Sequence, residues 1–286
     1  MYKYEKMRNG IWYDDSGDGL RVQRSLHEGE FTMPRYHMHA TYEVHFVVHG
    51  HTELECGTLT AEMRSPYIAV HRPYMPHRLR AKYDDAPYYR FILNFSDEFL
   101  EQAKLLVPAV ESLFMYTFFA LEITEEQCRE ILPRLEDAFR LYRSSRDGAC
   151  KLAVAMALDE MAAVLPHSRI IAAGGSIRYL DEVIRYIIAH ISEKLVCADV
   201  AAQFFISESK LAKDFKRCFG LAFNQYIMQL RVKMAKDLLS RGETGAVAAK
   251  ACGFCSPSYF IRVFKSYTGR TPSEFVHDDR ENSANA

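Results

Sequence analysis

The sequence lacks any long apolar segment. No run of about 18 or more apolar residues occurs, so we expect no membrane-spanning helix. The first residues lead into no apolar core of the kind that a secretory signal needs, so we expect no export. These absences predict a cytoplasmic globular protein with no membrane partner.

Cysteines are too few and too scattered for a disulfide framework. The chain has seven of them, and an odd number without regular spacing is typical of a reducing compartment. Cys252 and Cys255 form a Cys-x-x-Cys pair, but no second pair exists to complete a zinc site. We therefore interpret them as small core residues.

The chain as a whole has no excess of positive or negative charge, but its N-terminal and C-terminal regions differ in net charge. The 286 residues carry a net charge of −1. The segment 176–275 holds 15 Lys and Arg against 9 Asp and Glu, a net +6, which leaves −7 for the remainder. A basic C-terminal region beside an acidic N-terminal region is expected when only the former meets a polyanion such as DNA.

Short strand-like runs dominate residues 1–95. Runs such as 42–48 and 88–95 are rich in β-branched and aromatic residues, and glycines and prolines separate them. Many short strands joined by turns predict a sandwich or a small barrel.

A helical pattern begins at Ser96, which suits an N-cap, and residues 124–127 have the spacing of a capping box. We expect the helices of residues 96–171 either to cover the barrel or, preferably, to pair with those of a second chain as a dimerisation segment. The small residues of 172–177 suit a linker, and 277–286 is expected to be a disordered tail.

An internal repeat at a distance of about 49 residues is the strongest feature of the sequence. Segments 207–220 and 256–269 share two serines, a phenylalanine, a lysine and a glycine at matched positions. Each follows a short apolar segment, 200–204 or 247–252. A short helix, a tight turn and a capped second helix form a helix-turn-helix, whose second helix enters the major groove of DNA. We therefore predict an all-helical domain with two such units at 178–276.

Apolar and polar positions separate onto two faces of each second helix. Leu211 and Phe215, like Phe260 and Phe264, recur four residues apart and should pack inward. The outward positions between them can donate hydrogen bonds to base edges or phosphates. Such residues could merely be solvated, but their recurrence at matched positions favours DNA binding.

A single helix is predicted for residues 224–239, between the two units. At 1.5 Å per residue it would be roughly 24 Å long, which would set the two recognition helices about one turn of DNA, ~34 Å, apart. One chain could then read two successive major grooves.

Residues from about 180 to 275 resemble the DNA-binding domain of the AraC/XylS transcription regulators. The resemblance is carried by Leu230–Leu239, Cys252–Phe254, Ser258–Lys265 and Thr268–Phe275. It implies a DNA-binding activator that contacts RNA polymerase and responds to a small molecule, commonly a sugar. Phe205 stands where the family often has glycine in the first turn. The DNA-binding residues expected from pattern and resemblance are Ser207, Ser209, Lys210, Ala212, Lys213, Ser256, Pro257, Ser258, Tyr259 and Arg262.

Histidines are concentrated in the N-terminal part, where eight of the eleven precede residue 80. Residues 37–50 match the first cupin motif, and Pro73–His77 resembles the second. The resemblance implies an α+β protein with an N-terminal cupin-like β-barrel, further helices and the all-helical domain. Residues two or four apart on a strand share a face. The residues expected to point into the barrel are His37, His39, Glu43, His45 and His77.

Three uses of this cluster remain open. The preferred one is an effector-binding site formed by all five residues. His37, His39, Glu43 and His77 could instead bind a divalent zinc, iron, nickel or manganese ion, because imidazole and carboxylate groups suit these metals. The barrel could also be purely structural. No cofactor is otherwise expected.

Two functions follow from these features. The preferred one is an effector-controlled, non-enzymatic transcription regulator that binds double-stranded DNA as a homodimer. The alternative is a metal-dependent cupin enzyme fused to a DNA-binding module.

Overall fold

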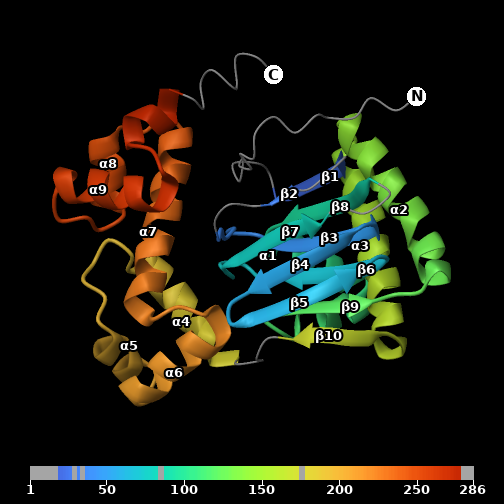
Figure 1. The fold of residues 1–286 in the computed structure, drawn as a ribbon, viewed down its shortest axis with the longest axis horizontal. Helices are drawn as coiled ribbons and strands as arrows, with labels where there is room; N and C mark the ends of the chain where they lie inside the picture. The colour runs from blue at the N-terminus through green and yellow to red at the C-terminus, as the bar shows by residue number, and fades with distance from the viewer. Residues whose placement is uncertain (1–18, 28–30, 33–35, 83–86, 174–177, 278–286) are drawn as a thin grey trace. The chain divides into compact units, whose positions relative to one another are not determined.

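The computed structural model describes residues 19–27, 31–32, 36–82, 87–173 and 178–277. The chain divides into two compact units, an N-terminal one that contains residues 1–176 and a C-terminal one formed by most of residues 177–286 (Figure 1). Among the described residues, no helix combines the length and apolarity needed to cross a membrane.

The N-terminal unit is built on two antiparallel sheets (Figure 1). The six-stranded sheet has the order β1-β8-β3-β6-β9-β10, and the four-stranded sheet has the order β2-β7-β4-β5. The strands are β1 (Leu20–His27), β2 (Phe31–Thr32), β3 (Tyr42–His49), β4 (His51–Cys56), β5 (Leu59–Arg64), β6 (Tyr67–His71), β7 (His77–Lys82), β8 (Tyr88–Phe95), β9 (Phe118–Glu122) and β10 (Arg169–Ala173).

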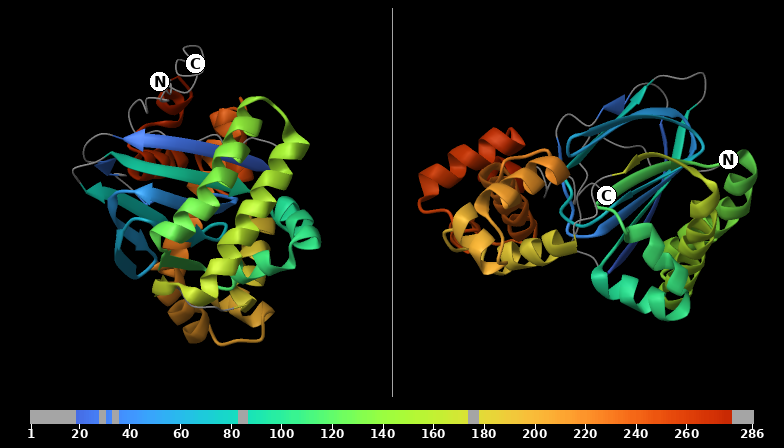
Figure 2. Two further views of the ribbon diagram at one scale, coloured as in Figure 1. Left: turned by 90° about the vertical axis from the view of Figure 1, so that its right-hand side faces the viewer. Right: turned by 90° about the horizontal axis from the view of Figure 1, so that it is seen from below.

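One face of the six-stranded sheet packs against helices (Figure 2). Val44 and Phe46 of β3 share this core with Leu135 of α2 and Leu158 of α3. Each is fully buried, and burial of one such side chain contributes about 1.5–3 kcal/mol. The helical elements of this unit are α1 (Asp97–Leu106), η1 (Pro108–Phe114), α2 (Glu125–Arg143), α3 (Asp147–Val164) and η2 (Leu165–His167).

The opposite face of the same sheet carries polar side chains into the space between the two sheets. Glu43 and His45 of β3 and Arg90 of β8 are 4%, 2% and 0% exposed. Burying charged groups is costly unless they are paired. Such a concentration of them marks this interior as a functional region.

The sequence pattern predicts only helices for residues 96–171. The structure differs, because this segment also contains strands β9 and β10 of the six-stranded sheet. Phe118–Glu122 is a short, buried apolar run, which periodicity alone cannot distinguish from a buried helix. The predicted linker 172–177 overlaps the end of β10, and its residues 174–177 lie outside the described residues. The predicted tail also lies outside them, apart from His277 at the end of a helical turn.

Both predicted helix starts in this segment are confirmed. The Ser96 hydroxyl accepts a hydrogen bond from the Phe99 amide at 3.3 Å. Thr124 and Gln127 form the complete capping box, with reciprocal bonds of 2.8 and 3.1 Å. Each cap satisfies amide groups that the first helical turn leaves without partners.

All regular secondary structure among the described residues of the C-terminal unit is helical. The predicted connector is α7 (Phe223–Ser240), whose 18 residues correspond to a rod of about 27 Å. The other helices are α4 (Arg178–Ala189), α5 (Cys197–Gln203), α6 (Glu208–Phe219), α8 (Gly245–Ala251) and α9 (Pro257–Thr268). The α+β organisation predicted from the sequence is confirmed.

Candidate functional site

Two helix-turn-helix units are present, α5–α6 and α8–α9. The hydroxyls of Ser207 and Ser256 cap the second helices by accepting hydrogen bonds from the amides of Lys210 at 3.2 Å and Tyr259 at 3.3 Å. Gly269 ends α9 in the left-handed conformation, with φ 85°. The repeat in the sequence therefore corresponds to a repeated structure.

The turns of the two units have the same hydrogen-bonding pattern but different residues. Phe205 (φ 55°) donates to the Ala202 carbonyl and Gly253 (φ 71°) to the Lys250 carbonyl, each at 3.1 Å. A left-handed backbone costs a non-glycine residue about 1–2 kcal/mol. Phe205 is 98% exposed, so its side chain gains little packing in return. The expectation that Phe205 occupies a position suited to glycine is confirmed.

The outer faces of α6 and α9 carry the predicted DNA-binding residues, and all ten of these are exposed. On the inner faces, Leu211, Phe215 and Phe264 are fully buried and Phe260 is nearly so. The predicted separation of faces is confirmed, whereas contact with DNA stays a prediction.

Asp214 holds one of these residues in place. Its carboxylate accepts hydrogen bonds from Lys210 at 2.8 Å, Arg217 at 2.9 Å and Tyr179 at 2.5 Å. Burial raises the pKa of Asp214, but the bonds from Lys210 and Tyr179 outweigh it and lower the pKa. Lys210 would have to exchange this partner to reach a phosphate. The sequence reading missed Asp214, although its spacing from Lys210 and Arg217 on one helix was a usable signal.

Arg262 is oriented on the outer face of α9 by an aromatic ring. Its Cζ atom lies 5.4 Å from the centroid of the Tyr259 ring, in cation–π geometry. A guanidinium oriented in this way loses less conformational entropy when it binds a base edge or a phosphate.

The turn of the second helix-turn-helix unit packs tightly against α7 and the segment before α5. Arg231 of α7 donates to the carbonyls of Ile191 at 3.1 Å and Glu193 at 2.6 Å, both in the segment before α5. A Cβ atom added to Gly253, in the turn of the second unit, would lie 2.6 Å from the Ile191 oxygen and 2.9 Å from Arg231. The second turn therefore packs directly on the contact between α7 and the segment that leads into the first helix-turn-helix unit.

In the N-terminal unit, the predicted histidine cluster also forms, but not by the alternation along one strand that we expected. β3 begins only at Tyr42. His37 pairs with His77 of β7 in an isolated antiparallel bridge, with N···O distances of 3.0 and 2.9 Å. His39 lies in the loop before β3, where its carbonyl accepts a hydrogen bond from the Tyr74 amide. Pairing between distant segments, rather than local periodicity, brings these side chains together.

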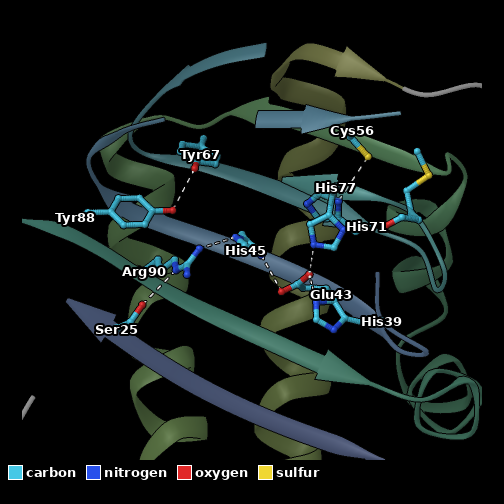
Figure 3. A network of polar contacts seen from close by, with 11 residues as sticks. Ser25, His39, Glu43, His45, Cys56, Tyr67, His71, His77, Tyr88 and Arg90 are labelled. Carbon is cyan, nitrogen blue, oxygen red and sulfur yellow. Dashed lines mark hydrogen bonds and ion pairs between the residues drawn. The ribbon is translucent and has the colours of Figure 1, made fainter. Parts of the chain in front are cut away.

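Glu43 is at the centre of the cluster (Figure 3). Its Oε2 lies 2.9 Å from Nε2 of His77 and 3.4 Å from Nε2 of His39, and its Oε1 lies 3.0 Å from Nε2 of His45. The ring centroids of His37 and His77 are 4.2 Å apart. All five predicted interior residues therefore converge.

Charges in the cluster reflect its burial. Burial alone would raise the pKa of Glu43, but His39, His45 and His77 outweigh it and hold the pKa well below its ordinary value. Burial lowers the pKa of His37 and His45. Near neutral pH the carboxylate is therefore ionised, and these two rings are neutral with one nitrogen lone pair each.

A second polar group, which the sequence reading missed, adjoins the cluster (Figure 3). Arg90 approaches Nδ1 of His45 at 3.3 Å and donates to Ser25 at 3.2 Å. His71 stacks near His77, with ring centroids 4.1 Å apart. The register of β3 and β6 places His71 opposite Glu43, but these strands are not consecutive, so no local pattern in the sequence predicts this pairing.

Comparison with known proteins identifies both units. The profile of the AraC-like ligand binding domain matches residues 22–158, which contain the whole histidine cluster. The profile of a helix-turn-helix domain matches residues 200–278, which contain both helix-turn-helix units. The chain belongs to the AraC family of transcription regulators. The limits of the barrel, dimerisation and linker segments stay predictions.

Curated relatives match about a third of this chain. The regulatory protein PocR of Salmonella typhimurium is 33% identical over 36% of this chain, and the uncharacterized HTH-type regulator YijO of Escherichia coli is 37% identical over 34%. Each alignment spans 35% of the relative's own length. The match therefore covers about a third of each relative.

Solved structures of ToxT from Vibrio cholerae share the fold. One covers 91% of this chain and 97% of ToxT with a TM-score of 0.59 and 17% identity. Another, of ToxT with a bound unsaturated fatty acid, covers 94% of this chain and 97% of ToxT with a TM-score of 0.59 and 15% identity. At such identities the likeness shows the fold alone.

Proposed function

We propose that this AraC-family protein binds specific DNA sequences through both helix-turn-helix units and that an effector in its N-terminal unit controls this binding. The observation that supports this proposal best is that α6 and α9 each expose a polar, basic face. They are connected by α7 and by the packing of Gly253 against Ile191 and Arg231. Connected recognition helices can engage one duplex together, which adds their binding energies without a second loss of orientational freedom.

For the effector site we propose His37, His39, Glu43, His45 and His77. The buried Arg90 adds a further polar group to the same interior (Figure 3). The hydroxyls of Thr52 and Tyr67, which are 2.7 Å apart, add two more. Such a lining favours a polar small molecule such as a sugar, since each buried polar group gains most from a hydrogen-bonding ligand. The effector must bind the active and inactive states with different affinities to shift their populations.

We further propose a homodimer formed by residues 96–171. Leu152 and Met156 lie four residues apart on α3 and are 52% and 37% exposed, which suits an apolar contact between helices. Because the proposed partner is chromosomal DNA, we place the protein in the cytoplasm. We propose sensing rather than catalysis because PocR is a regulatory protein. Activation and contact with RNA polymerase rest on the family resemblance.

Salt dependence tests the DNA-binding proposal. Contact with roughly five phosphates should give a slope of about −4.5 for log K against log salt, a several-hundred-fold loss between about 50 and 200 mM. Lys213→Ala should reduce the magnitude of the slope by about 1, because Lys213 is an exposed cation on α6.

Fluorescence anisotropy with a duplex selected from a random pool measures this slope. Lys104→Ala is the matched control, since Lys104 lies on α1 of the N-terminal unit and should leave the slope unchanged. Failure to select any duplex, or binding that does not respond to salt, would contradict the proposed function.

A further inference from the structure

We propose that His37, His39, Glu43 and His77 bind a divalent first-row transition-metal ion inside the N-terminal unit. One ligand atom from each residue can be chosen so that all four lie within 4.8 Å of one another. Bonds of about 2.1 Å allow at most roughly 4.2 Å between two ligands on opposite sides of an ion. Side-chain adjustments of less than about 1 Å would therefore complete the coordination sphere.

The orientation of His77 supports this proposal. Its Nδ1 lies 2.8 Å from the Met75 carbonyl, which can only accept a hydrogen bond, so Nδ1 carries a proton. Nε2 is therefore the nitrogen that faces Oε2 of Glu43, at 2.9 Å, and a metal ion in the cluster could be bound by both atoms. A backbone carbonyl that fixes the far nitrogen is the usual support for a metal-binding histidine.

Glu43 is held in a matching way. Arg90 can only donate, so Nδ1 of His45 accepts its hydrogen bond and the proton of this ring is on Nε2, which lies 3.0 Å from Oε1 of Glu43. Oε1 therefore faces His45, and Oε2 faces His39 and His77.

Buried atoms of the cluster face one another without a hydrogen bond of acceptable geometry. Within the described part of the chain these atoms include Oε2 of Glu43 and Nε2 of both His45 and His77. Glu43 and His77 are only 4% and 3% exposed. Buried polar atoms without hydrogen bonds are costly, and a bound ion would satisfy Oε2 of Glu43 and Nε2 of His77 at once.

The donor set selects the class of ion. Three imidazoles and one carboxylate suit zinc, iron, nickel or manganese, whereas calcium and magnesium prefer all-oxygen sites. An ion with five or six ligands would keep positions at which an effector could bind directly. Metal binding does not depend on the proposed regulation of DNA binding.

Elemental analysis of the purified full-length protein, prepared without chelators or immobilised metal, tests the proposal. We expect close to one transition-metal ion per chain in the wild type and a loss of this metal in Glu43→Gln and in the His37→Ala/His77→Ala double variant. His49→Ala is the matched control, because His49 is exposed at the end of β3 and should not alter the metal content.

Titration of the chelator-treated wild type with Co²⁺ gives a second readout that needs no variant to fold. A visible ligand-field absorption that saturates at one ion per chain would support the site even if the isolated protein had lost its metal. Wild-type protein without metal and without saturable Co²⁺ absorption would overturn the proposal. Metal retained by both variants would also overturn it. DNA binding by the same preparations would separate this failure from a failure of the proposed function.

Discussion

Arg262→Ala is expected to weaken binding to the preferred duplex by about 1–3 kcal/mol, roughly a 5- to 150-fold rise in Kd. Arg262 is exposed on α9, and its contact with the Tyr259 ring orients the guanidinium before DNA arrives. A bidentate hydrogen bond to a guanine edge would be lost in the variant, whereas the fold should not change because the side chain is at the surface.

Comparing two duplexes by fluorescence anisotropy decides how Arg262 acts. If it reads a base, the loss occurs on the preferred duplex and is small on a scrambled one. An equal loss on both would show a phosphate contact instead, and no loss on either would exclude Arg262 from the interface. Arg140→Ala, which removes an exposed arginine from α2, controls for the change in net charge.

Gly253→Ala is expected to destabilise the C-terminal unit by about 2–4 kcal/mol. Gly253 has a left-handed backbone, and its added Cβ would lie 2.6 Å from the Ile191 carbonyl oxygen. The junction with Arg231 would have to open. Urea denaturation of the full-length chain measures the change in the free energy of unfolding.

Gly242→Ala separates the two causes. Gly242 also has a positive φ, of 91°, but a Cβ there would meet no atom within 4 Å. It should therefore cost only the backbone strain, about 1–2 kcal/mol. Equal effects of the two substitutions would show that the junction is not tight. A tight junction also predicts that Gly253→Ala reduces affinity for a duplex carrying both half-sites more than for one carrying a single half-site.

The helical unit was largely predictable because its signals are local. The capping serines Ser207 and Ser256 and the apolar spacing of Phe260 and Phe264 each act over a few residues, and the repeat presents them twice. Hydrogen bonds and packing within single helices then decide the structure, so sequence patterns carry the information.

The interior of the N-terminal unit was predictable only in part. The convergence of five residues was foreseen from motif resemblance, but His71 and Arg90 enter the same space from β6 and β8 through strand pairing. Register between distant strands leaves no periodic signal in a single sequence. Strand β9 was missed for a related reason, since a strand buried on both faces has no alternating pattern.

The junction of the two helix-turn-helix units was not predictable either. It depends on Arg231 reaching the carbonyls of Ile191 and Glu193 across about forty residues of sequence. Gly253 could be recognised as a turn residue. Only the folded unit shows that the Ile191 carbonyl and Arg231 occupy the space in which a side chain at this position would lie.

Footprinting of the full-length protein on its selected duplex tests most directly whether both units of one chain bind one duplex. We predict, for each bound chain, two protected major-groove segments on the same face of the DNA, about 10 base pairs apart. Inserting about 5 base pairs between them should reduce the affinity to that of a single half-site, because the segments then face opposite sides of the helix. A single protected segment, or an affinity unchanged by the insertion, would contradict the account.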